Sequence, residues 1–181
     1  MVMAYKKQVL KDVSGNTIEF IATSEETGGC FTKIKITLQP QHPQYSQYIQ
    51  LQQTETLEIL SGESTYILNG NVSSARVGET IIVSKGQLHN HFNASATAPL
   101  VMIQTIAPSL DFEPFIKTFW GLRQAGERRK LNFWQKMVWL KYLEGPVLFG
   151  DMPERLQRFI AQMFAPLAWL MGYRTFYSKY L

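Results

Sequence analysis

Cysteine is scarce in this chain of 181 residues, and Cys30 is its single thiol. One cysteine cannot form a disulfide within the chain or build a zinc site of four thiolates. We therefore expect the protein to work in a reducing compartment, the cytoplasm. Because Cys30 follows the Gly28-Gly29 turn and opens an alternating segment, we predict a buried structural thiol rather than a nucleophile.

Long apolar runs and targeting signals are also missing. The N-terminal segment MVMAYKKQVLKDV lacks the apolar core and cleavage site of a signal peptide, and no stretch of about 18 apolar residues occurs. With 45% hydrophobic and 18% charged residues, the chain can bury a core of its own. We expect one soluble domain with an appendage.

Several motifs of catalysis and nucleic-acid recognition are absent. The sequence contains no Gly-rich phosphate loop, no zinc-finger spacing and no G-x-S-x-G nucleophile elbow. The one dense basic run, at 128–130, lies between two apolar-periodic segments, and we interpret it as a solvated loop. We expect no nucleic-acid partner.

Charged and aromatic residues are distributed unevenly about Pro108. Residues 1–109 carry 7 Lys and Arg against 8 Asp and Glu, whereas residues 110–181 carry 11 against 6. Phe, Trp and Tyr number 7 in the first part and 16 in the second. We therefore divide the chain into residues 1–108 and 109–181, with different roles.

The first part has the rhythm of short strands. From Asn16 to Ile106, β-branched and aromatic runs are separated by Gly and Asn at intervals of roughly 8–12 residues. Within 31–38, the side chains of Thr32, Ile34, Ile36 and Leu38 share one face. Closure of these strands into a jelly-roll barrel would remove exposed strand edges. The predicted strands are 17–23, 31–38, 48–53, 57–60, 65–68, 80–83, 89–93 and 101–106.

Two segments of this part resemble cupin motifs. The segment GETIIVSKGQLHNHFN, at 78–93, is similar to the second cupin motif, although Ser84 stands where proline is usual. The segment ETLEILSG, at 55–62, resembles the second half of the first motif. The tail is similar to that of small bacterial cupins with a helical extension. The resemblance implies a mainly β fold, a jelly-roll (cupin) β-barrel over 1–108 with a C-terminal α-helical extension over 109–181.

The resemblance also implies a metal site, which this sequence fills only in part. Metal-binding cupins use two His of an H-x-H, a following Glu and a His of the second motif. The H-x-H positions fall here on Tyr48 and Gln50, whereas Glu55 and His89 fill the other two. Because a protonated phenol and a neutral amide are weak ligands, we expect a metal-free lumen and no cofactor.

His91 leaves an alternative open. It follows His89 by two residues, so on a strand both side chains face the same way. In this alternative Gln50, Glu55, His89 and His91 hold a divalent transition metal, and the protein is a metal-dependent dioxygenase or isomerase. Otherwise His91 fills space and forms a hydrogen bond with Tyr48 or Gln50.

We predict that the lumen binds a small organic ligand, with no reaction assigned. Partial desolvation would raise the pKa of Glu55 toward neutrality, which makes Glu55 and His89 the best candidates for acid–base catalysis. The remaining histidine, His42, lies in a Pro-rich loop that we place at the surface. The predicted lumen residues are Tyr48, Gln50, Glu55, His89 and His91.

After Pro108 the hydrophobic period changes from two to about 3.6, which predicts three helices. Asn132 is expected to cap the second, residues 151–154 form a capping box for the third, and Pro166 should kink or split it. The inward stripes are predicted to be Phe112, Phe115, Ile116, Phe119 and Leu122 in the first helix, Phe133, Met137, Val138 and Leu140 in the second, and Leu156, Phe159, Ile160, Met163, Phe164, Leu167 and Leu170 in the third.

These stripes need a burial partner, and three compete: the barrel, a second copy of the chain, or a membrane surface. We favour packing on the barrel or in a homodimer. The positive charge of residues 110–181 and the side chains of Trp134, Trp139 and Trp169 would favour peripheral contact with a membrane. The apolar stretch 159–172 is too short to span a bilayer. In a third interpretation the chain is an interaction or membrane-peripheral module and the barrel is only a scaffold.

Overall fold

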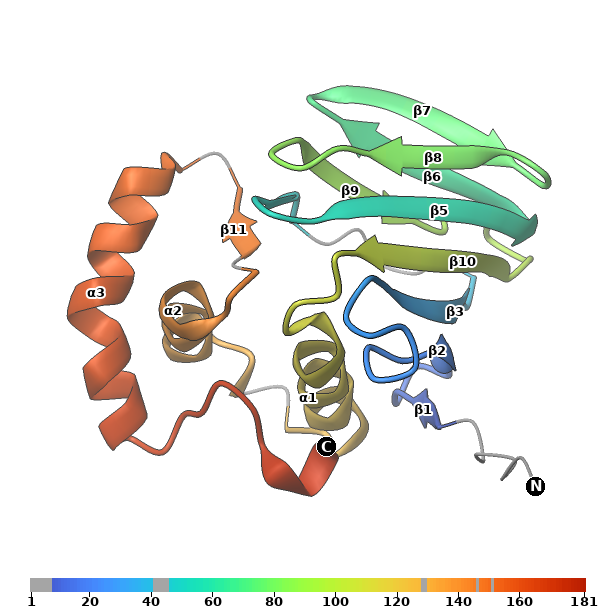
Figure 1. The fold of residues 1–181 in the computed structure, drawn as a ribbon. Helices are drawn as coiled ribbons and strands as arrows, with labels where there is room; N and C mark the ends of the chain where they lie inside the picture. The colour runs from blue at the N-terminus through green and yellow to red at the C-terminus, as the bar shows by residue number, and fades with distance from the viewer. Residues whose placement is uncertain (1–7, 41–45, 128–129, 146, 151) are drawn as a thin grey trace.

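Two antiparallel sheets face each other in the computed structural model, which describes residues 8–40, 46–127, 130–145, 147–150 and 152–181 (Figure 1). The six-stranded sheet has the order β1 (Val9–Lys11), β2 (Thr17–Ala22), β3 (Thr32–Leu38), β10 (Leu100–Ala107), β5 (Thr54–Ser61), β8 (Thr80–Val83). The five-stranded sheet has the order β11 (Val147–Phe149), β4 (Tyr48–Gln50), β9 (Leu88–Phe92), β6 (Glu63–Leu68), β7 (Asn71–Arg76). The predicted mainly β, jelly-roll architecture is confirmed.

Alternation along the strands builds the barrel core. In β3, every second side chain from Thr32 to Leu38 is buried, as the sequence predicted. In β10, Met102 lies opposite Ile36 of β3 and Ile59 of β5. These three side chains are at most 6% exposed and belong to one hydrophobic cluster between the sheets. The cluster extends to Phe112 and Trp120 of the first helix, so that helix is part of the barrel core.

Three strands were missed by the sequence analysis. Five of the six side chains of β7 are exposed, so this edge strand shows no apolar alternation. β1 has three residues and pairs only with β2 among the described strands. β11 comes from the helical part of the chain, yet it pairs with β4 of the barrel. The boundary at 108/109 therefore falls between β10 and the first helix, while the second part contributes a strand to the barrel sheet.

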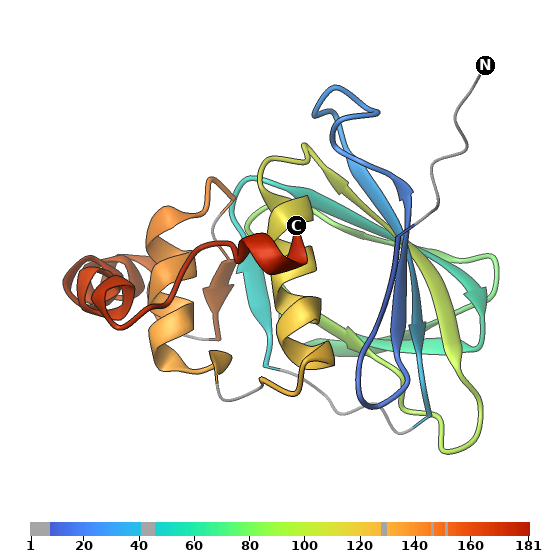
Figure 2. The same ribbon diagram turned by 90° about the horizontal axis from the view of Figure 1, so that it is seen from below.

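Helices α1 (Phe112–Gln124), α2 (Phe133–Tyr142) and α3 (Glu154–Leu170) follow the barrel, and a short 3-10 helix, η2 (Ser178–Tyr180), ends the chain. α1 lies against the barrel, α2 lies outside α1, and α3 is outermost (Figures 1 and 2). The Asn132 side chain accepts hydrogen bonds from the backbone N–H groups of Trp134 and Gln135, which confirms the predicted cap. α3 is not split at Pro166.

Several burial predictions are wrong. Of the predicted α3 stripe, only Ile160 and Phe164 are partly buried, against the cluster that α3 shares with α2. The other five stripe residues are exposed, and the fully buried positions of α3 are Gln157, Ala161, Ala165 and Ala168. Small side chains there allow α3 to approach α2 closely. Phe133 is 46% exposed, and Cys30 is exposed instead of buried.

The predictions for His42, for the basic pair Arg128 and Arg129, and for the cap at Asp151 fall on residues outside the described part of the chain. Within the described part, no helix combines the length and the apolar character needed to cross a bilayer.

Candidate functional site

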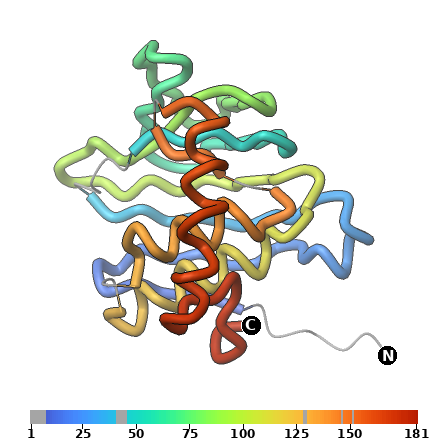
Figure 3. The backbone as a smooth tube through the Cα atoms, turned by 90° about the vertical axis from the view of Figure 1, so that its left-hand side faces the viewer, coloured from blue at the N-terminus to red at the C-terminus, as the bar shows by residue number. Residues whose placement is uncertain are grey.

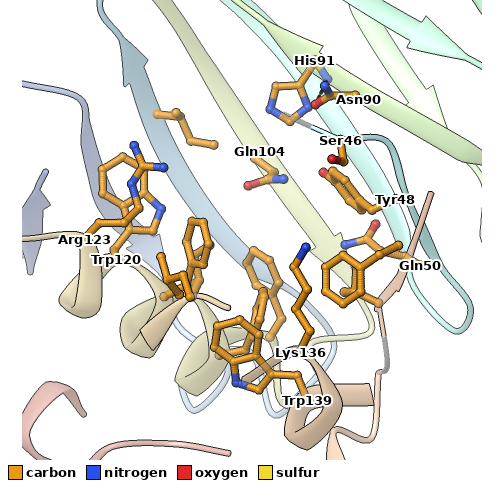
Figure 4. Close-up of a pocket in the computed structure, with 18 of the residues that line it drawn as sticks. Ser46, Tyr48, Gln50, Asn90, His91, Gln104, Trp120, Arg123, Lys136 and Trp139 are labelled. Atoms are coloured by element: carbon orange, nitrogen blue, oxygen red, sulfur yellow. Dashed lines mark hydrogen bonds between the residues drawn. The ribbon is translucent and has the colours of Figure 1, made fainter. Parts of the chain in front are cut away.

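A cavity of about 540 Å³ lies between the barrel and the helical extension (Figure 4). This volume falls in the range of small-molecule sites. One wall is aromatic, since α1 and α2 turn their rings inward, and Phe115 and Trp139 pack edge to face with centroids 5.0 Å apart. The opposite wall comes from the strands and is polar. The lining includes Phe112, Phe115, Ile116, Phe119, Trp120, Lys136 and Trp139 from the helices and Tyr48, Gln50, Asn90, His91 and Gln104 from the strands.

Antiparallel pairing brings the polar residues together. Tyr48 of β4 lies directly opposite His89 of β9, and their ring centroids are 4.2 Å apart. Glu55 belongs to β5 in the other sheet and reaches across the barrel toward them. Gln104 of β10 lies beside it, because β10 and β5 are neighbours in that sheet.

The Glu55 carboxylate is the centre of a buried hydrogen-bond network. Its Oε1 accepts a hydrogen bond from Gln104 Nε2 at 2.7 Å, and its Oε2 accepts one from the Tyr48 hydroxyl at 3.3 Å. His89 Nε2 lies 3.1 Å from Oε2, and His91 Nδ1 lies 3.6 Å from Oε1. A buried carboxylate requires such partners, because an unpaired one would be strongly destabilising.

The contacts of His89 define its protonation. Its Nδ1 lies 2.9 Å from the Gln87 carbonyl oxygen, which can only accept. Its Nε2 faces a Glu55 oxygen, so both ring nitrogens face acceptors. Burial lowers the pKa of His89, but the hydrogen bond and negative charge of Glu55 outweigh burial and raise it. We conclude that His89 is an imidazolium paired with the Glu55 carboxylate.

Burial and nearby charges also set the pKa values of Glu55, His91 and Tyr48. Burial raises the pKa of Glu55, but the hydrogen bond from His89 and the charges of His91 and His89 lower it below its usual value, so the predicted rise toward neutrality is wrong. Burial lowers the pKa of His91 despite the Glu55 charge, so His91 is neutral at neutral pH. Burial and the Glu55 charge raise the pKa of Tyr48 well above its usual value, so its phenol stays protonated.

Two features of the lining face a prospective ligand. The side chain of Gln50 is buried, and its Oε1 has no hydrogen-bond partner among the described residues. Lys136 reaches from α2 toward Gln50 and Gln104 in Figure 4. The other cation of the lining, Arg123, is neutralised by Asp12, which its Nε and Nη2 groups contact. The lining contains no acidic side chain among the described residues.

The five predicted lumen residues all lie in this region, but they occupy two layers. Tyr48, Gln50 and His91 line the cavity. Glu55 and His89 lie behind them, with side chains 0% and 2% exposed, and do not reach the cavity surface. Glu55 and His89 therefore position the residues in front of them.

Sequence reasoning missed Gln104 and the helical wall. Gln104 is an amide within the otherwise largely apolar run Val101–Ile106, which is the signal that the sequence offered, and the structure shows it to be 5% exposed. The stripe of α1 was recognised from its period. Its half-buried members Phe115, Ile116 and Phe119, however, face the cavity as well as the core.

The residues present do not fit the metal that the sequence resemblance implies. Tyr48 keeps its proton and donates a hydrogen bond to Glu55, so it offers no phenolate. Glu55 already accepts hydrogen bonds at both oxygens. Among the described residues, no three His, Cys, Asp or Glu side chains form a group arranged to hold a metal ion.

Comparisons with solved structures identify the fold of this chain. No family model and no curated protein matches the sequence. Solved structures do match, among them a sugar phosphate isomerase of the cupin superfamily from Silicibacter pomeroyi, at 12% identity and a TM-score of 0.50 over 58% of this chain and 73% of that one. An RmlC-like cupin from Shewanella frigidimarina matches at 12% identity and a TM-score of 0.49, over 62% of this chain and 94% of that one. A Streptomyces nucleoside dehydratase matches at 14% identity and a TM-score of 0.46, over 60% and 81%. The chain has the cupin fold, which confirms the fold expected from its motifs.

Proposed function

We propose that the protein binds a small organic molecule in the cavity between its barrel and its helical extension. The ligand has an apolar, ring-sized body, a group that donates a hydrogen bond to Gln50, and an anionic or strongly accepting group near Lys136. Binding needs no metal. The observation that carries the proposal is the buried, unpartnered Gln50 Oε1 inside an aromatic-walled cavity.

The chemistry of the two walls supports this ligand class. Phe112, Phe115 and Phe119 offer apolar and aromatic surface to a planar body. An unpaired buried acceptor such as Gln50 Oε1 is costly, and a ligand donor would remove that cost. Lys136 is the lining cation without a carboxylate contact among the described residues, so it favours an anion over a cation.

Glu55 and His89 support binding without touching the ligand. Their ion pair keeps the Tyr48 hydroxyl and the Gln104 amide directed toward Glu55. The neutral His91 ring remains at the cavity surface and can exchange a hydrogen bond with the ligand. In this proposal Glu55 and His89 are positioning residues.

The proposal can be tested with three probes that share a naphthalene body. Isothermal titration of the wild-type protein with 2-naphthol, 2-naphthoate and 2-naphthylmethylammonium should give at least tenfold tighter binding of the carboxylate than of the ammonium. Lys136→Met should reduce this preference to less than threefold. Lys141→Met, on the same helix but over the Tyr142 ring and outside the cavity lining, should leave it unchanged.

Two further variants connect binding to the cavity itself. Gln50→Leu should weaken naphthol binding about 5- to 10-fold, as expected for a hydrogen bond of about 1 kcal/mol, and should not lower the thermal stability of the free protein. Ile116→Trp should abolish binding by filling the cavity. The proposal is wrong if no probe binds below about 1 mM, or if the probes bind the Ile116→Trp variant as well as the wild type.

A further inference from the structure

The outermost helix exposes a continuous apolar stripe. Figure 3 shows α3 on the face of the molecule farthest from the barrel. The five large apolar side chains of the stripe are 47% to 77% exposed. An apolar patch of this kind marks an interaction site rather than ordinary surface. The stripe consists of Leu156, Phe159, Met163, Leu167 and Leu170.

The stripe has no burial partner within the described chain. α3 contacts α2 through its opposite face, where Ala161, Ala165 and Ala168 are at most 1% exposed. Removing a large apolar side chain from water is favourable. Burial of the five stripe residues in an interface would therefore contribute substantially to the free energy of association.

The spacing of the stripe is symmetric about Met163. Counting from Leu156, the intervals are 3, 4, 4 and 3 residues, so Leu156 and Leu170 are equidistant from Met163, as are Phe159 and Leu167. In an antiparallel pair of identical helices a two-fold axis makes each contact occur twice, so this spacing lets every stripe residue meet a stripe residue of the second copy. The repeat of 11 residues, 3.67 per turn, keeps the stripe nearly parallel to the helix axis.

We propose that α3 is the interface of a homodimer, with a two-fold axis passing beside Met163. Met163 packs against Met163 of the second copy, Leu156 against its Leu170, and Phe159 against its Leu167. The helix is about 25 Å long at 1.5 Å per residue, which gives four turns of contact.

The available area is sufficient for a stable dimer. Met152 and Met171 lie near the two ends of the stripe and are 45% and 58% exposed. At roughly 100 Å² for each half-exposed large side chain, these seven residues offer about 700 Å² per copy. One side of a standard stable interface buries about that area.

The charges beside the stripe favour a protein partner over a lipid surface. Arg158 is engaged by Glu154 on the same helix, with Nε 2.7 Å from Oε1. Arg174 stacks on the Trp169 ring at 4.4 Å and donates to the Trp169 carbonyl oxygen. Arg158 and Arg174 are therefore already partnered, which leaves Arg155 as the exposed α3 cation that no described carboxylate contacts. Binding to anionic lipid relies on several available cations. A bilayer also places no demand on symmetric spacing.

The test exploits the contact of Met163 with its own copy. Analytical ultracentrifugation at about 50 μM should show the wild-type chain as a dimer. Met163→Glu and Met163→Lys should each raise the dissociation constant at least 100-fold, because like charges then face each other across the axis. An equimolar mixture of the two variants should restore the dimer. Val77→Glu, at an equally exposed apolar position away from α3, should remain dimeric.

Cysteine pairs test the register. In a Cys30→Ser background, a mixture of Leu156→Cys and Leu170→Cys chains should cross-link under mild oxidation, and Leu156→Cys alone should not, because a disulfide requires Cα atoms within about 7 Å. The proposal is overturned if the wild type is monomeric at 500 μM or if Met163→Glu stays dimeric. It is equally overturned if a monomeric wild type sediments with phosphatidylcholine–phosphatidylglycerol vesicles and Met163→Glu does not, since α3 would then bind lipid.

Discussion

Replacement of Glu55 by Gln tests whether the buried network contains an ion pair. Gln has the shape of Glu, so its oxygen can still accept from Gln104 and its amide can donate to a neutral His89. The variant loses a charge-assisted hydrogen bond of roughly 1.5–3 kcal/mol, together with the acceptor for Tyr48. It also removes the desolvation penalty of a buried charge. We expect a net destabilisation of about 1–3 kcal/mol at pH 6, whereas Glu55→Ala should cost about 3–5 kcal/mol because it leaves the His89 charge unpaired.

The pH dependence gives the sharper test. The folded pKa of Glu55 is lowered, so its contribution is present above about pH 4.5 and is lost as the pH falls through the folded value. The folded pKa of His89 is raised, so its contribution is complete below about pH 6.5 and is lost as the pH rises through the folded value. The difference between wild type and Glu55→Gln should therefore be largest between about pH 4.5 and 6.5.

Urea unfolding of both proteins at pH 4, 6 and 8.5 measures this difference. The unfolding free energy of each protein also contains the titration of His91, whose lowered pKa weakens both folded states below about pH 6.5. For that reason the difference, rather than either curve alone, is the measured quantity. A difference that stays constant from pH 4 to 8.5 would refute the assignment of His89 as an imidazolium paired with Glu55.

Three other substitutions test the contacts between the barrel and the helical extension, a tight turn between two barrel strands, and the packing of the C-terminal segment. Arg123→Met should lower the free energy of unfolding in urea by about 3–5 kcal/mol, because it leaves the buried Asp12 carboxylate unpaired. Arg123→Lys should recover only part of this loss, since Lys cannot reproduce the contacts of both Nε and Nη2. Gly62→Ala should cost at least 1 kcal/mol more than Gly70→Ala: both glycines have positive φ, but only at Gly62 would a Cβ lie 2.6 Å from the Pro99 carbonyl oxygen. A smaller difference would show that the turn relaxes freely. Gly121→Leu should release the C-terminal segment from α1, because a Cβ there would lie 2.3 Å from the Tyr180 ring. Limited proteolysis should then remove the last residues faster than in the wild type. Unchanged cleavage would contradict this packing.

Local periodicity was enough to find most elements. Strands such as β3 and β8 have one buried face, and a period of two follows directly from that burial. The helices were recognised from their 3.6-residue period and from the cap at Asn132. Strand β7 was missed because an exposed edge strand has no apolar face to reveal it.

The sequence by itself determined the cupin-type barrel and the helical extension, because strand parity and motif spacing are local properties of the chain. It also predicted five lumen residues that the structure brings into one region. It did not determine which of those residues reach the cavity. Glu55 and His89 are hidden because Tyr48 and Gln104 close over them, and this depends on how the two sheets face each other.

Only the tertiary structure decided what each apolar stripe touches. A helical period defines a face but not its partner. α1 turns its stripe toward the cavity and the barrel core, whereas α3 packs mainly through alanines and turns five of its seven predicted stripe residues outward. The physical reason is that close helix packing selects small side chains on the inward face, so hydrophobicity alone cannot tell a buried stripe from an exposed one.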